Sequence, residues 1–290
     1  MIEVEENEQS ALFPEAQLLL DKDEQIKALD ELFSRSAHYR VGANYFALLQ
    51  FINRLPNLAP FNAFLIHMQH PGVQYVATAS QWEKKFNRKL KRDARPLVIL
   101  IPFGPMSFVY DVSETIGEPL PREVLRPFET KGRLSNDIFV LTLLNCKRDF
   151  IPVHESDFGA GQAGYAQRQY HNFSIGINKN NPLEDKYSTL CHELGHIYSG
   201  HVGTTPDTWW PDRSKASKDV KEIEAESISF LVCKRMGLAT TSEEYLSTYI
   251  QKHKELSPFS FETVLTVAHY IERMGKEKMK PRKPDEKKKR

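Results

Sequence analysis

Hydrophobic residues recur at helical spacing in several parts of the chain. This pattern predicts one or two helices within 24–53, and further helices at 60–68, from Ala79 onward, at 136–144 and at 262–274. Strands are expected at 73–76, 97–101, 107–112, 151–154 and 173–177, where apolar residues alternate or form a short run. The run at 97–101 lies between two prolines, which predicts a buried strand in a hairpin with 107–112. Helices mixed with short strands predict an α+β fold.

The chain is long enough for two domains. Residues 113–133 are rich in proline, glycine and charge, as linkers are. We expect disorder at 1–12, one domain at 13–125, a second at 126–274 and a basic tail at 275–290. Residues 276–290 hold nine positive and three negative residues, which fits either affinity for nucleic acid or a solubilising role.

Composition narrows the class of protein. The formal net charge is +1, so the overall charge indicates no partner. No apolar run is long enough to cross a membrane, and the acidic N-terminus does not resemble a secretory signal peptide. The three cysteines are odd in number and widely spaced, which indicates reduced thiols in a cytoplasmic protein.

A further helix is predicted between 181 and 200. Asn181 is placed to cap it, Pro182 to occupy its first position, and Ser199-Gly200 to end it. The strand at 173–177 leads into this helix. As an edge strand it would pair with an extended substrate, but an ordinary strand fits the pattern as well.

This helix carries the sequence His-Glu-Leu-Gly-His at 192–196. His192 and His196, four residues apart, lie on one face and can offer two nitrogens to one metal ion. Glu193 is placed to accept a proton from water, which is the arrangement of zinc peptidases. The alternative is a histidine pair on an ordinary amphipathic helix.

A catalytic zinc site of this kind needs a third protein ligand. The metzincin pattern is excluded, because Ser199 and Val202 occupy its glycine and histidine positions. A helix opening near Asp219 offers Glu222 and Glu226 on one face, one as ligand and the other to orient a histidine. Alternatively, these acids only complement the dipole of an exposed helix start.

A cluster of positive charge lies in the first half of the chain. Trp82 and Phe86 are interleaved with it, and cations with aromatic rings are typical of proteins that bind single-stranded nucleic acid. The alternative is a solvated basic helix with two core aromatic residues. The seven positive residues, within twelve positions, are Lys84, Lys85, Arg88, Lys89, Lys91, Arg92 and Arg95.

The histidine motif at 192–196 and the acidic motif at 222–226 together resemble those of a known family. His192–His196 followed by Glu-Ile-Glu-Ala-Glu at 222–226 resembles the ImmA/IrrE family of metallopeptidases. The resemblance implies a zincin-like domain, with Glu222 as third zinc ligand and Glu226 as an orienting group. Glu224 is the ligand if the register differs by two, and His201 lies beside the site or in the substrate pocket. Many members have asparagine where this chain has Glu226, and the glutamate resembles the ArdC-type antirestriction proteins instead.

The first half resembles the DNA-binding domain of those ArdC-type proteins. The similarity rests on Asn62, Gln69-His70-Pro71, Trp82 with the basic segment, and the strands at 99–102 and 108–112. It implies a helical domain with a small sheet that binds single-stranded DNA. Tyr110 and Glu114 replace the usual phenylalanine and glutamine.

Together these features predict a zinc metalloendopeptidase of the gluzincin type. We expect it to act on DNA-associated or regulatory proteins, tethered through single-stranded DNA. One alternative is a non-proteolytic, DNA-binding antirestriction or protective protein with structural zinc. Another is a sensor that exposes a partner surface when zinc binds.

Overall fold

The computed structural model describes residues 39, 41–101, 106–120, 133–158, 162–206, 208–238, 246, 248–249, 256 and 258–280. The expectations for 1–12, for the helical segment before residue 39, for the boundary at 125/126 and for most of the basic tail lie outside these residues. Within them the chain mixes helices with small sheets, as the pattern predicted. None of the described helices is both long and apolar enough to cross a membrane.

The described residues of the N-terminal part form three α-helices and two small sheets. One sheet has the strand order β1-β4-β3 and the other pairs β2 with β5, all antiparallel. The predicted helices at 60–68 and from Ala79 are confirmed, and a capping box of Thr78 and Gln81 opens the second. The elements are α3 (Gly42–Arg54), α4 (Pro60–Gln69), β1 (Val76–Ala77), α5 (Ala79–Phe86), β2 (Arg88–Leu90), β3 (Leu97–Leu100), β4 (Met106–Asp111) and β5 (Thr115–Gly117).

The β3–β4 hairpin is confirmed, but the expected burial of its first strand is wrong. Leu97 is buried, whereas Leu100 is 45% exposed. Its cross-strand partner Met106 is 62% exposed, and Phe108, which pairs with Val98, is 53% exposed. A continuous apolar run does not distinguish a strand covered on both faces from one covered on a single face. The hairpin therefore presents an apolar outer face.

Two amide side chains of α4 occupy the free edge of β3. Asn62 donates to the Leu100 carbonyl and accepts from the Leu100 N–H, at 2.9 and 3.0 Å. Gln69 makes the same pair of bonds to Val98, each 2.8 Å. Residues 98 and 100 direct their backbone groups to the same edge, so the amides replace a neighbouring strand. The edge is thereby closed to strand addition.

The linker expected at 113–133 is in part ordered structure. A 3-10 turn, η1 (Val112–Glu114), leads into β5, which pairs with β2. Arg88 fixes β5 in place, because its guanidinium donates to Thr115 and to the Gly117 and Glu118 carbonyls. Residues 121–132 lie outside the described part of the chain.

The C-terminal part places helices against a three-stranded sheet. Its order is β6-β8-β7, with β6 parallel and β7 antiparallel to β8. Of the two interpretations of 173–177, the ordinary strand holds and the edge strand does not, because β8 is central among the described strands and β7 and β6 are the edges. The elements are α7 (Asn136–Arg148), β6 (Val153–Ser156), β7 (Gly164–Gln169), β8 (Asn172–Asn178), α8 (Leu183–Tyr198), α9 (Lys218–Arg235) and α11 (Phe261–Lys276).

The predicted start of α8 is one residue early. Pro182 is the N-cap and Leu183 the first helical residue, without a side-chain cap from Asn181. The predicted end is confirmed: Ser199 is the C-cap, and Gly200 follows with a φ of +75°.

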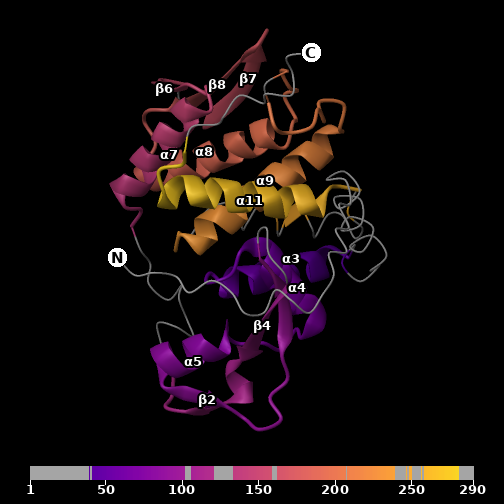
Figure 1. The fold of residues 1–290 in the computed structure, drawn as a ribbon. Helices are drawn as coiled ribbons and strands as arrows, with labels where there is room; N and C mark the ends of the chain where they lie inside the picture. The colour runs from indigo at the N-terminus through magenta and orange to yellow at the C-terminus, as the bar shows by residue number, and fades with distance from the viewer. Residues whose placement is uncertain are drawn as a thin grey trace, which may run out of the picture.

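The two parts share one hydrophobic core. Figure 1 shows α3 and α4 beneath α9 and α11, with α5 and β2 at the far end from the β6-β8-β7 sheet. The ring of Phe261, at the start of α11, lies 5.9 Å from Tyr45 and 5.0 Å from Phe64. Tyr45 also donates to Ser227 of α9, at 2.9 Å. The helices of the first half are therefore packed directly on those of the second.

Candidate metal centre

The helices α8 and α9 approach closely where neither carries a large side chain. Gly195 of α8 faces Ala225 of α9, and a Cβ added to Gly195 would lie 3.3 Å from the Ala225 Cα. This is tighter than ordinary contact, so a larger residue would press the helices apart. The close approach brings Glu222, about one turn before Ala225, beside the histidines of α8.

Three potential ligands meet at this crossing. Nε2 of His192 lies 3.1 Å from Nε2 of His196. The Glu222 carboxylate lies 3.7 Å from the first nitrogen and 3.8 Å from the second. One ligand atom from each residue falls within 4.8 Å of the others. Two bonds of about 2.05 Å at a tetrahedral angle separate their nitrogens by about 3.3 Å, so the three residues fit a tetrahedral divalent ion.

Each histidine is held on the side opposite to this cluster. Nδ1 of His192 lies 3.4 Å from Oε1 of Glu226. Nδ1 of His196 lies 3.0 Å from Nδ1 of His201. Groups that engage the outer nitrogen of a ligand imidazole are typical of metal sites, because they orient the ring. The geometry thus places Glu226 and His201 against the outer nitrogens of the two histidines.

The surroundings favour neutral imidazoles. Burial lowers the pKa of His192. Burial, together with the neighbouring rings of His192 and His201, lowers the pKa of His196 to about 2. A neutral ring is the form that binds metal, so neither histidine must lose a proton at pH 7.

Glu193 lies under the start of β7. Burial, and then the negative charge of Glu222, raise its pKa to about 8. The backbone N–H of Ala166 on β7 donates to this carboxylate and partly offsets those effects. Gly164 allows the approach, because a Cβ there would lie 2.5 Å from the Thr189 methyl and 3.6 Å from Glu193. A carboxylate poised in this way can exchange a proton near neutral pH.

Glu224, the alternative third ligand, does not join this cluster. It is fully buried on another face of α9 and accepts from His201 at 2.8 Å, from Arg213 at 2.5 and 2.6 Å, and from the Ser260 N–H at 2.7 Å. Two residues apart on a helix, Glu222 and Glu224 differ in direction by about 200° around its axis, so only one of them can face the histidines of α8. The sequence motif alone did not determine which.

Two of the residues predicted to bind DNA, Trp82 and Arg88, are buried and cannot contact it. Trp82 is completely buried, packs against Tyr75 and Phe86, and donates to the Tyr110 carbonyl at 2.9 Å. Arg88 is 9% exposed, and its guanidinium is used to hold β5. The interpretation of Trp82 as a base-stacking residue and of Arg88 as a phosphate contact is therefore wrong. Residue type and spacing did not reveal which rings form the small core.

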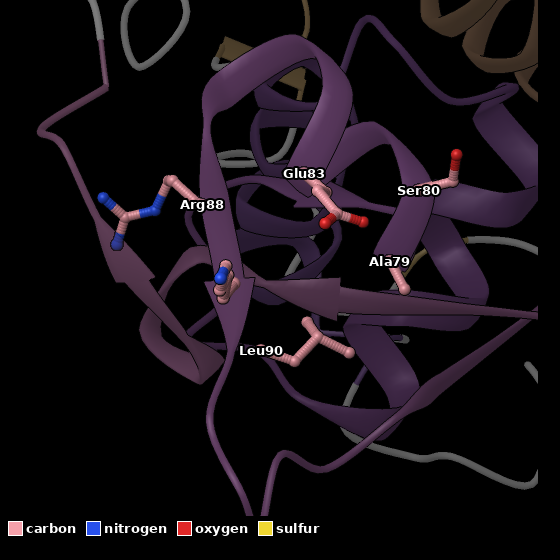
Figure 2. Close-up of a pocket in the computed structure, with 6 residues that line it drawn as sticks. Ala79, Ser80, Glu83, Arg88 and Leu90 are labelled. Atoms are coloured by element: carbon pink, nitrogen blue, oxygen red, sulfur yellow. The ribbon is translucent and has the colours of Figure 1, made fainter.

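The remaining cations are exposed, namely Lys84, Lys85, Lys89, Lys91, Arg92 and Arg95. Of these, Lys89 lines a pocket of about 350 Å³ between α5 and the strand β2. Figure 2 shows this pocket, with Glu83 and Ser80 of α5 and Leu90 of β2 among the residues that line it. Phe108, in the same half of the chain, is an exposed aromatic residue that the sequence pattern was not used to identify. The alternation in β4 could have found it, because Phe108 lies on the face opposite to the buried Val109.

Comparisons with known proteins found one family model and two similar crystal structures. A search of curated proteins found no match. The crystal structure of the antirestriction protein ArdC from plasmid R388 in its Mn(II)-bound form is 14% identical, with a TM-score of 0.40, covering 88% of this chain and 98% of that one. For the metal-free form the identity is 13%, the TM-score 0.38 and the coverage 83% and 96%. The family model of the IrrE N-terminal-like domain, Peptidase_M78, matches residues 146–233, which contain the histidine motif and the acidic motif of α9.

Proposed function

We propose that the chain is a zinc-dependent metallopeptidase of the zincin-like type. The observation that carries the proposal is the meeting of His192, His196 and Glu222 with a buried carboxylate, Glu193, next to them. A zinc ion held by these ligands supplies Lewis-acid chemistry, polarising a peptide carbonyl and making water easier to deprotonate. A structural zinc site has no use for a neighbouring base.

Glu193 has the properties of the general base. It takes a proton from the attacking water and returns it to the amine that leaves. Its raised pKa belongs to the protein without metal, and a nearby cation favours the ionised form that the first step needs. The contact from Ala166 keeps the carboxylate beside β7.

The peptide substrate is expected to pair with β7, not with the central strand β8. β7 is an edge strand, and it runs beside Glu193. An extended peptide added to this edge would pass the base, which is how strand addition aligns a substrate.

The first half is proposed to bind single-stranded DNA and so to concentrate the peptidase near DNA-associated or regulatory proteins. The exposed cations attract phosphate, and Phe108 offers a ring for base stacking. Arg95 precedes β3 by two residues and Phe108 pairs with Val98, so about 10 Å of extended chain separates positions 95 and 98. Cations and ring can therefore engage one strand of nucleic acid.

Elemental analysis and cleavage assays test the proposal. We expect one zinc per chain, lost in Glu222→Ala. We expect Glu193→Gln to keep zinc and to lose cleavage by at least about 100-fold, as removal of a general base does. A folded wild-type protein that takes up no supplied zinc would overturn the proposal. If Glu193→Gln keeps full biological activity, the non-proteolytic alternative holds instead.

Stimulation by DNA tests the tether. Cleavage of a DNA-bound protein should rise when single-stranded DNA is present, and the rise should disappear in a variant that lacks Lys91 and Arg92. Equal rates with and without DNA would contradict the tether while leaving the peptidase proposal intact.

A further inference from the structure

A chain of side chains leads away from the proposed metal centre into the loop between α8 and α9. Nδ1 of His196 lies 3.0 Å from Nδ1 of His201, and Nε2 of His201 lies 2.8 Å from Oε2 of Glu224. Arg213 grips the same carboxylate with both terminal nitrogens, at 2.5 and 2.6 Å. We infer that Arg213 and Glu224 act through His201 to select the tautomer of His196 that offers Nε2 to a metal. The inference rests on the proposed metal site.

The Glu224 carboxylate, at the outer end of this series of hydrogen bonds, acts only as an acceptor. Arg213 has donors and no acceptor, and the Ser260 N–H, 2.7 Å from Oε1, is also a donor. These three bonds place a donor on each carboxylate oxygen of Glu224. The nitrogen of His201 that faces Glu224 must therefore carry its proton as a donor.

The direction of every later bond follows. A neutral His201 with its proton on Nε2 has a bare Nδ1, which accepts. The nitrogen facing it, Nδ1 of His196, must then carry a proton. In neutral His196 this leaves Nε2 without a proton, directed at His192 and Glu222. His201 is only 4% exposed, and burial disfavours the charged form of an imidazole.

The loop is built to bring Arg213 to this position. Gly200 ends α8 with a φ of +75°, and a Cβ there would lie 1.9 Å from the Pro211 carbonyl oxygen. The Arg213 N–H donates to the Gly200 carbonyl at 3.0 Å. Only a residue without a side chain lets residues 211–213 pack this closely on the turn. Arg213 and Glu224 touch no proposed substrate position, so they are positioning residues.

Zinc affinity of the full-length protein tests this role, measured by competition with a chromophoric chelator. Removing an orienting group of a ligand histidine costs about 10- to 100-fold in metal affinity. We expect such a loss in Arg213→Met, and in Glu224→Gln, where an amide nitrogen must face one of the donors. Arg213→Lys should recover most of the affinity, since it restores a cation. Lys215→Met, which removes an exposed cation of the same loop, should leave the affinity unchanged.

Nitrogen NMR of the histidines without metal separates a tautomer effect from a loss of structure. In the wild type we expect the proton of His196 on Nδ1, and in Arg213→Met or Glu224→Gln a mixture that includes Nε2. If one variant does not fold, the other carries the test. Unchanged zinc affinity and an unchanged tautomer in a folded variant would overturn the inference. Failure of the wild type to bind zinc is a different result, because it would overturn the metal site itself.

Discussion

Arg235, near the end of α9, joins the two halves of the chain. Its side chain is 2% exposed and donates to Glu272 of α11 at 3.0 Å. Its two terminal nitrogens donate to the carbonyls of Ile52 at 3.0 Å and of Leu58 at 2.6 Å, in and after α3. We expect Arg235→Met to destabilise the whole protein, because methionine fills part of the volume and satisfies none of these acceptors.

The size of the effect follows from what is left behind. Removing one partner of a buried ion pair costs about 3–5 kcal/mol. Lys276 also lies 2.5 Å from Glu272, so that carboxylate keeps one cation. This places the expected loss near the lower end, about 3 kcal/mol, which is a large part of a typical domain's stability.

Chemical denaturation, followed by the fluorescence of the tryptophans in both halves, measures this loss. We expect the midpoint to fall with an unchanged m-value, and the signals of the two halves to fall together. Lys276→Met is the matched control, because its side chain is 49% exposed and its loss should cost no more than about 1 kcal/mol. A loss below about 1 kcal/mol in Arg235→Met, or a shift confined to one half, would refute the coupling.

Three further predictions concern single side chains. In metal-free protein the folded-state pKa of Glu193, about 8, exceeds its ordinary value of 4.5, so this residue lowers the stability of the fold as pH rises from about 4.5 to 8. The stability gained in Glu193→Gln should therefore grow over that range, by at most about 1.4 kcal/mol per pH unit. Denaturation in the presence of a chelator at pH 5 and pH 8 measures it, and a smaller gain at pH 8 than at pH 5 would contradict the prediction. Phe108→Ala should weaken binding of single-stranded DNA by about 1–3 kcal/mol without changing the stability of the fold, whereas Trp82→Ala should lower that stability by about 3–5 kcal/mol. Fluorescence anisotropy measures the DNA binding and thermal melting the stability, and DNA binding by Phe108→Ala equal to that of the wild type would remove that ring from the interface. Gln69→Leu should free the edge of β3 and promote association of the chain, and light scattering no higher than in wild type would contradict its role as an edge cap.

The sequence predicted the helices well, because their apolar positions repeat over long segments. It also predicted that His192, His196 and Glu222 meet, since spacing within each helix and the family resemblance determine which face each residue occupies. The comparison of 146–233 with the IrrE N-terminal-like domain confirms that resemblance. The choice between Glu222 and Glu224 required the crossing at Gly195, which depends on tertiary packing.

Other features had no local signal. Nothing near Arg213 in the sequence indicates that a loop arginine reaches a carboxylate eleven residues later. The order β6-β8-β7 places the last strand of the three in the middle, which alternation along one strand cannot reveal. Trp82 was misread because aromatic rings beside lysines occur both on DNA-binding faces and in small cores.

The packing of Tyr45 and Phe64 on Phe261 also bears on how the chain can be divided. These rings hold the halves together without help from the peptide bonds between residues 120 and 133. Two polypeptides, one ending at 120 and the other beginning at 133, are therefore expected to find each other and assemble when they are produced together. The protein could then serve as a split reporter, in which recovery of the metal centre signals that two fused partners have met.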